Sequence, residues 1–228
     1  VKELLEIGEI ALGNPVEIEF AVNLKQDNCQ THKPTFYILQ IRPLSINTDA
    51  YQINTQELVK RDLLMYTEHG MGNGIFEDLH DVIYLDPRTF DKTKTYAMQQ
   101  EIESFNTKMA KADKAYILIG PGRWGSRDRF LGIPVRWPQI SRAKVILETG
   151  LKDFIVEASQ GTHFFHNLLA MNVGYFTIPY TSQTDFVDWD WLMKQPHCQR
   201  GEYFVHLEFD HPLLVKMDGK TGKAVILK

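Results

Sequence analysis

The order of apolar and polar residues along this chain predicts helices and strands in alternation. Residues 1–12 place Leu4, Leu5 and other apolar residues on one side at helical spacing, and a Gly-Asn-Pro sequence then ends the helix. Residues 16–24 and 35–44 are rich in β-branched and aromatic residues and read as strands. We therefore expect a helix followed by a hairpin whose two strands are joined by a long polar connection.

The same patterns predict further elements beyond the hairpin. We expect helices over residues 55–70 (with Thr55 as N-cap), 93–112, 161–174 and 185–195. We expect strands over residues 81–87, 115–120, 143–149, 153–159 and 175–180, and C-terminal strands joined by a hairpin turn at Asp218–Gly219. This alternation predicts the α/β (or α+β) class.

Composition narrows the classes of protein to which the chain can belong. It has 228 residues, of which 43% are hydrophobic and 24% charged, with a net charge of −4. This composition is typical of globular proteins and gives no general attraction to nucleic acid. We expect neither a membrane span nor a nucleic-acid partner, and the two cysteines, Cys29 and Cys198, suit the cytoplasm. The chain begins without Met and in a helical pattern, so we expect a fragment of a longer protein.

Four polar residues on the first two predicted strands suggest a site. Glu17 and Glu19 lie two apart and so share one face, and Gln40 and Arg42 do the same on the second strand. Carboxylates suit Mg²⁺ and a guanidinium suits phosphate, so the four could hold a metal-bound polyphosphate. The alternative is a solvated strand face with cross-strand Glu–Arg pairs.

These residues and their apolar frame carry a family resemblance. With the preceding helix, "PVEIEF…FYILQIRPL" resembles the C-terminal end of the ATP-grasp domain of the phosphoenolpyruvate synthase and pyruvate phosphate dikinase family. That family has an acidic-x-Glu pair followed by Gln-x-Arg, although its first acidic residue is more often Asp than the Glu17 found here. The resemblance implies that Glu17, Glu19, Gln40 and Arg42 bind Mg-ATP, with Glu17 and Glu19 as the metal ligands.

The resemblance sets the expected domain organisation and function. Residues 1–46 would be the C-terminal piece of an ATP-grasp domain, 47–80 a helical linker, and 81–228 a mixed-sheet α/β domain of unknown role. The expected function is that of an ATP-dependent phosphotransferase of the kinase or dikinase type, which uses ATP, Mg²⁺ and a small anionic substrate of the pyruvate or phosphoenolpyruvate class. The rest of the ATP site would come from the upstream part of the same polypeptide, so the fragment alone is expected to be inactive.

A second candidate site is the segment 120–129, "GPGRWGSRDR", which follows a predicted buried strand. It matches neither a P-loop nor a convincing dinucleotide-binding turn. Its glycines and cations could form an anion site; they are Gly120, Gly122, Arg123, Arg127 and Arg129, with Trp124 and Trp137 as nearby stacking surfaces. The alternative is a structural loop held by Arg–Asp pairs and Trp packing. If the anion site is the main feature, the chain could instead be a non-catalytic regulatory module that recognises an anionic small molecule.

A third candidate is His163 in "SQGTHFFHNLLA", in the first turn of a predicted helix. A phosphohistidine domain follows the ATP-grasp domain in the resembled family, which makes His163 a candidate phosphocarrier. A further hypothesis is that His163 shares one ligand with the arginines of segment 120–129. The two Phe residues after His163 depart from the family's pattern. A packed or capping histidine is the alternative, and a metal site with His166 is a further one.

Overall fold

The computed structural model describes residues 1–12, 16–23, 34–43, 53–54, 58–126, 128, 130–155 and 172–228. It divides the chain into two compact units, Val1–Thr48 and Asp49–Lys228. The first unit ends within two residues of the boundary that we expected at residue 46. Each unit has an architecture of its own.

The first unit is a helix packed on a β-hairpin, as the sequence predicts. It contains α1 (Lys2–Leu12), β1 (Val16–Asn23) and β2 (Thr35–Pro43), and the two strands are antiparallel. Helix and hairpin approach closely at Gly8, where a Cβ atom would lie 2.6 Å from Ile41 Cδ1 and 2.8 Å from Val16 Cγ2. Since Val16 and Ile41 belong to the apolar face of the hairpin, α1 covers that face.

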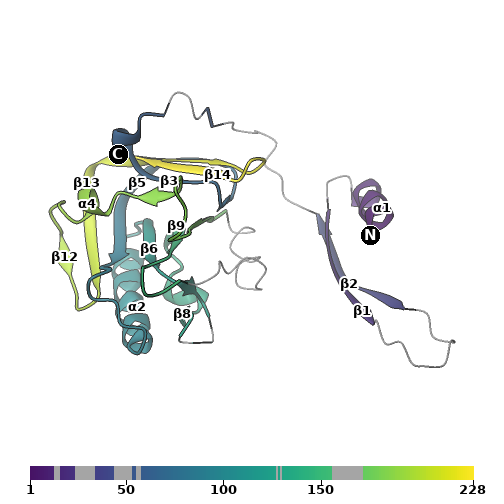
Figure 1. Ribbon diagram of the computed structural model, residues 1–228, viewed down its shortest axis with the longest axis horizontal. Coiled ribbons are helices and arrows are strands. Elements are labelled where there is room, and N and C mark those ends of the chain that lie inside the picture. Colours follow the sequence, from purple (N-terminus) through teal and green to yellow (C-terminus); the bar gives the residue numbers. More distant parts are fainter. Residues whose placement is uncertain are drawn as a thin grey trace. The chain divides into compact units, whose positions relative to one another are not determined.

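The second unit is built around one large sheet, and its described residues also form two helices and two short 3₁₀ segments (Figure 1). The strands of the sheet are β3 (Leu63–Thr67), β4 (Gly70–Met71), β5 (Gly74–Leu85), β6 (Tyr116–Pro121), β9 (Ala143–Thr149), β10 (Gly174–Ile178), β11 (Phe186–Val187), β12 (Gln199–Arg200), β13 (Phe204–Asp218) and β14 (Lys223–Leu227). A separate parallel pair is formed by β7 (Arg123–Trp124) and β8 (Gly132–Ile133). The helical segments are η2 (Lys60–Asp62), α2 (Thr95–Lys111), η3 (Trp137–Gln139) and α4 (Trp189–Leu192).

The sheet combines a parallel centre with antiparallel flanks. Its order is β11-β3-β14-β13-β5-β6-β9-β10-β4, with β12 paired to β13. Strands β5, β6, β9 and β10 are parallel neighbours, whereas β13, β14, β3 and β11 pair antiparallel. In β13, the register with β5 shifts between Glu208 and Leu213. Pro212 lies in this irregular stretch, where its missing N–H costs no ladder hydrogen bond.

The sheet curls until strands from its two ends meet. Thr67 Oγ1, at the end of β3, donates to the carbonyl of Thr177 in β10 at 2.6 Å, and Thr177 N donates to the carbonyl of His69 at 3.1 Å. Next to this junction, Gly70 N donates to the carbonyl of Gly222 at 2.6 Å. A Cβ at position 70 would lie only 2.7 Å from Ala224 Cβ, so glycine allows this close approach.

Both faces of the curled sheet are packed with apolar side chains. Helix α2 lies along one face, where Met98, Ile102 and Phe105 contact residues such as Tyr116 and Leu118 (Figure 1). The other face gathers side chains from the whole width of the sheet, among them Leu64 of β3, Ile117 of β6, Phe176 of β10 and Ile226 of β14, together with Leu192 of α4. Two apolar layers on one sheet explain why the central strands are continuous hydrophobic runs.

The structure corrects the expected fold class. We predicted α/β (or α+β), but the molecule is mostly β, because strand residues far outnumber helical residues and the mixed sheet is not regularly wrapped by helices. One cause lies in residues 55–70, which we predicted to be a helix and part of a helical linker. Residues 60–62 form η2 and residues 63–67 form β3 instead, and Thr55 lies outside the described residues.

Other predicted elements had different outcomes. The helix at 93–112 and the strands within 81–87, 115–120, 143–149 and 175–180 are confirmed. The helix expected at 185–195 is reduced to α4, which Asp188 caps by accepting from Trp191 N at 3.0 Å, and β11 precedes it. The helix at 161–174 and most of the strand at 153–159 fall outside the described residues.

Candidate functional site

The hairpin of the first unit brings the four predicted Mg-ATP residues into register. Glu17 lies directly opposite Arg42, and Glu19 directly opposite Gln40, before the register shifts between Glu19 and Phe20. Directly opposed residues of an antiparallel pair share a face, so the four residues form the corners of a rectangle on one face of the hairpin. This is the face opposite to Val16 and the other apolar residues on which α1 packs.

The chemistry of this face suits a magnesium-bound polyphosphate only in part. Two carboxylates provide the hard oxygen ligands that Mg²⁺ prefers, and an amide and a guanidinium provide phosphate partners. Glu17 is half-buried and Glu19 is exposed. Within the described residues, no three His, Cys, Asp or Glu side chains gather closely enough to hold a metal ion. The hairpin therefore offers two carboxylates, and phosphate oxygens or further residues would have to complete the coordination.

The glycine-arginine segment lies at the carboxyl end of β6, and its described part is tightly packed. Gly122 and Gly125 have φ angles of +71° and +76°, a conformation that glycine adopts without strain. Trp124 is buried rather than available for stacking on a ligand. Its backbone N donates to Glu148 Oε1 at 3.0 Å, and its indole N donates to the carbonyl of Leu147 at 3.0 Å.

The remaining predicted site residues are less fully placed. Gly120 is a buried residue near the end of β6, and a Cβ there would lie 2.5 Å from the Trp124 ring. Arg123 is half-buried in β7 and has an interaction partner. Arg127, Arg129 and His163 lie outside the described residues, as does His166, so the idea that the arginines and His163 share one ligand stays a prediction.

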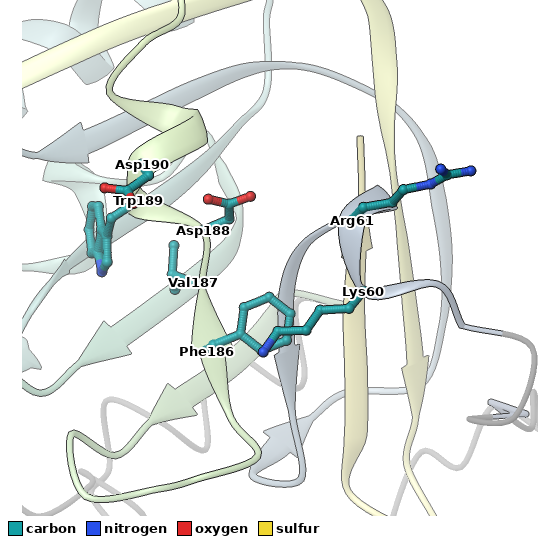
Figure 2. A pocket seen from close by; sticks show the side chains of 7 residues that line it. All are labelled: Lys60, Arg61, Phe186, Val187, Asp188, Trp189 and Asp190. Carbon is teal, nitrogen blue, oxygen red and sulfur yellow. The ribbon is translucent and has the colours of Figure 1, made fainter.

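Two open hollows lie on the surface of the described part of the second unit. One, of about 450 Å³, lies between η2 and the segment from β11 to α4 (Figure 2). Figure 2 shows the Lys60 side chain reaching toward the Phe186 ring, while the Arg61 guanidinium points away. Lys60 Nζ lies 4.9 Å from the centre of that ring, and Lys228 Nζ lies 2.6 Å from Asp188 Oδ2. Lys60 and Lys228 therefore already have partners within the fold, and neither is left to bind a ligand in this hollow.

The other hollow, of about 470 Å³, lies beyond the carboxyl ends of β5 and β9. Its lining mixes apolar and charged side chains: Pro87, Phe90, Lys92, Leu151, Lys152, Asp153 and Phe154. Beside it, the buried Asp86 carboxylate accepts from two arginines: from Arg88 Nη2 at 2.6 Å and from Arg200 Nη2 at 2.7 Å. The hydrogen bonds from Arg88 are the main cause that lowers the pKa of Asp86 to about 2. This ion cluster ties the end of β5 to β12.

Three residues far apart in the sequence form a hydrogen-bonded series that our sequence reasoning missed. Cys198 Sγ lies 3.1 Å from His206 Nδ1, and His206 Nε2 lies 2.6 Å from Asp81 Oδ1. Asp81 belongs to β5 and His206 to β13, and the two strands are hydrogen-bonded neighbours. Cys198 precedes β12, and its backbone N donates to the carbonyl of His206 at 3.0 Å. We call Cys198, His206 and Asp81 the thiol triad.

Charged side chains surround the thiol triad. Lys114 Nζ lies 3.7 Å from Asp81 Oδ2 and also pairs with Glu208. Burial is the largest cause that raises the pKa of Cys198; the charges of Glu208 and Asp81 raise it further, and Lys114 opposes them. The only signal in the sequence was a Cys and a His eight residues apart around a predicted turn, since nothing there indicates that Asp81 is a neighbour.

None of the described helices combines the length and the apolar composition that a membrane crossing needs. Comparison of the chain with protein-family models, with curated proteins and with solved structures finds no match.

Proposed function

We propose that the first unit is one wall of a Mg-ATP site in an ATP-dependent phosphotransferase similar to phosphoenolpyruvate synthase. The observation that carries this proposal is the register of the hairpin, in which Glu17 opposes Arg42 and Glu19 opposes Gln40. A Mg-ATP site needs carboxylates for the metal ion and hydrogen-bond donors for the phosphates, and this register places an acidic pair opposite an amide and a guanidinium. In this proposal Glu17 and Glu19 bind Mg²⁺, and Gln40 and Arg42 contact the phosphates.

A second observation supports the expectation that the wall is incomplete by itself. The first unit leaves many large apolar side chains open to solvent; those at least 40% exposed are Val1, Ile7, Ile10, Phe20, Val22, Tyr37, Ile38, Leu39 and Ile41. An apolar surface of this extent is typical of an interface. We propose that the upstream ATP-grasp segments of the same polypeptide cover it, and that the acceptor is a small anion of the pyruvate class. The scarcity of cysteine supports a cytoplasmic location.

The test is an Arg42→Ala substitution in a polypeptide that includes the remaining ATP-grasp segments. Loss of one charge-assisted hydrogen bond to phosphate should weaken Mg-ATP binding by about 1–3 kcal/mol, measured by titration calorimetry. Arg61→Ala, which removes an exposed arginine of the second unit, is the control and should leave the affinity unchanged. Equal affinities for Arg42→Ala and the unsubstituted protein would refute the proposed role of Arg42.

The metal part of the proposal can be tested on this chain alone. Mn²⁺ broadens the NMR signals of nearby amides, so it should broaden those of Glu17 and Glu19 before those of exposed acidic positions such as Asp78. The double substitution Glu17→Gln and Glu19→Gln should abolish this preferential broadening, because the glutamine side chains do not provide charged oxygen ligands. Uniform broadening across the acidic residues would count against a metal site on the hairpin.

A further inference from the structure

The thiol triad has the hydrogen-bond order that a proton relay needs. The Asp81 carboxylate can only accept, so the hydrogen bond at 2.6 Å places the imidazole proton of His206 on Nε2. Nδ1 then presents its lone pair to the Cys198 thiol at 3.1 Å. A thiol, an imidazole and a carboxylate in hydrogen-bond contact form the general arrangement of an activated nucleophile, with its base and a group that orients the base.

Burial decreases along the triad from the carboxylate to the thiol. Asp81 is 2% exposed, the His206 side chain is 12% exposed, and Cys198 is exposed. The Phe105 ring lies edge-on to the imidazole, with 6.4 Å between the ring centres, and holds it against β5. The base and its orienting group are thus fixed in the structure, while the sulfur is accessible from solvent.

We propose that Cys198 is a reactive thiol that exchanges with low-molecular-weight disulfides, with His206 as its base and Asp81 as the positioning residue. The thiol proton moves to His206 Nδ1 as Cys198 Sγ attacks one sulfur of the disulfide. A new S–S bond forms, the old S–S bond breaks, and the departing sulfur takes the electron pair and then the proton from His206. The small disulfide is reduced to one thiol as Cys198 is oxidised to a mixed disulfide.

The charged groups around Cys198 Sγ determine the pH range in which His206 accelerates the reaction. The groups that face the triad are Lys114, from the connection between α2 and β6, and Glu208 from β13, and Lys108 of α2 binds the neighbouring Gln199 at 2.9 Å. Since burial and the two carboxylates raise the pKa of Cys198, the resting thiol is protonated at neutral pH. The imidazole should therefore accelerate the reaction most at neutral pH and lose its advantage at alkaline pH, where the thiolate forms unaided.

The experiment measures the rate at which the protein releases chromophore from 4,4′-dithiodipyridine, a neutral disulfide. A Cys29→Ser background leaves Cys198 as the single thiol. At about pH 6.5 the folded protein should react at least about tenfold faster than the same chain unfolded in urea. His206→Asn, which keeps a polar group near Nδ1 but removes the base, should lower the folded rate at least about tenfold, and the difference should vanish as the pH rises above the thiol pKa. Asp81→Asn should give an intermediate rate and the same convergence.

A matched control is His197→Asn, the same substitution on the residue next to Cys198, and it should change the rate less than about twofold. Circular dichroism establishes that each variant is folded before its rate is used. Equal rates for His206→Asn and its parent at pH 6.5, or a His206→Asn deficit that persists unchanged at alkaline pH, would overturn the proposal. The comparison of folded with unfolded parent needs no substitution at the triad, so a folded rate no faster than the unfolded one overturns it even if every triad variant fails to fold.

Discussion

The two units of this protein differ in how far they bury the apolar side chains of their strands. In the second unit the large apolar side chains of β6, β9 and β10 are almost all buried, and both faces of the sheet are covered. In the first unit, β1 and β2 carry similar residues, yet most of them are exposed. Strand sequences of equal hydrophobicity therefore serve two purposes: one set forms a core, and the other set presents a surface that needs a partner.

The most direct test of this difference is to truncate one phenylalanine side chain in each unit. Phe176 in β10 is fully buried, whereas Phe20 in β1 is 44% exposed and stacks on Phe36 with ring centres 4.7 Å apart. Phe176→Ala should lower the free energy of unfolding of the second unit by about 3–5 kcal/mol. Phe20→Ala should cost the chain less than about 1 kcal/mol, because little burial is lost. Urea unfolding measures both, and similar costs would show that the first unit has a core of its own.

The next largest effect on stability comes from the ion pairs of Asp86 with Arg88 and Arg200, and it depends on pH. The folded pKa of about 2 lies below the ordinary 3.8, so the carboxylate stabilises the fold above about pH 4 and loses that contribution as the pH falls toward 2. Allowing for the exposed Arg88, the contribution is about 1–2 kcal/mol. Asp86→Asn should lower stability by this amount at neutral pH, and the difference from the unsubstituted protein should shrink between about pH 4 and 2.

The control for Asp86 is Asp78→Asn on the same strand, where the side chain is exposed. It should change stability by less than about 0.5 kcal/mol at any of these pH values. A deficit of Asp86→Asn that is the same at pH 6 and at pH 2 would mean that the carboxylate acts through packing and not through its charge.

The smallest expected effect belongs to the first unit. Lys2 and Glu6 are one helical turn apart in α1, with 3.9 Å between Nζ and Oε1, and both side chains are largely exposed. Lys2→Met should change the helicity or stability of the first unit by at most about 0.5 kcal/mol, and less at high salt. A larger loss, measured by circular dichroism at low and high salt, would mean that this ion pair within α1 contributes more to the helix than its exposure suggests.

Sequence patterns predicted helix α2 and the buried strands β6, β9 and β10 but failed for β3. Helix α2 has one apolar and one polar face, so its period is clear. Residues Leu63, Leu64 and Met65 of β3 are all buried, and a run of consecutive apolar residues has no period that distinguishes strand from helix. We took it for a helix, and this mistake contributed to the wrong fold class.

The two candidate sites also differ in how far the sequence alone could predict them. Glu17, Glu19, Gln40 and Arg42 could be grouped from the sequence because their strands are close in the chain and the i, i+2 rule fixes their face. The thiol triad could not, because Asp81 is more than a hundred residues from His206 and meets it only through the pairing of β5 with β13. Pairing between distant strands depends on the whole topology, and local patterns do not encode it.

The pairing of β3 with β14 has a consequence for the synthesis of the chain. Strand β3 spans residues 63–67, and the longer of its two neighbours in the sheet, β14, spans residues 223–227. On the ribosome, at roughly 5–20 residues per second, β3 must wait on the order of ten seconds or more for that partner to be made. During this interval its unpaired backbone is an open edge on which other chains can add. We therefore expect nascent chains that stall before residue 223 to be the forms of this protein most dependent on chaperones.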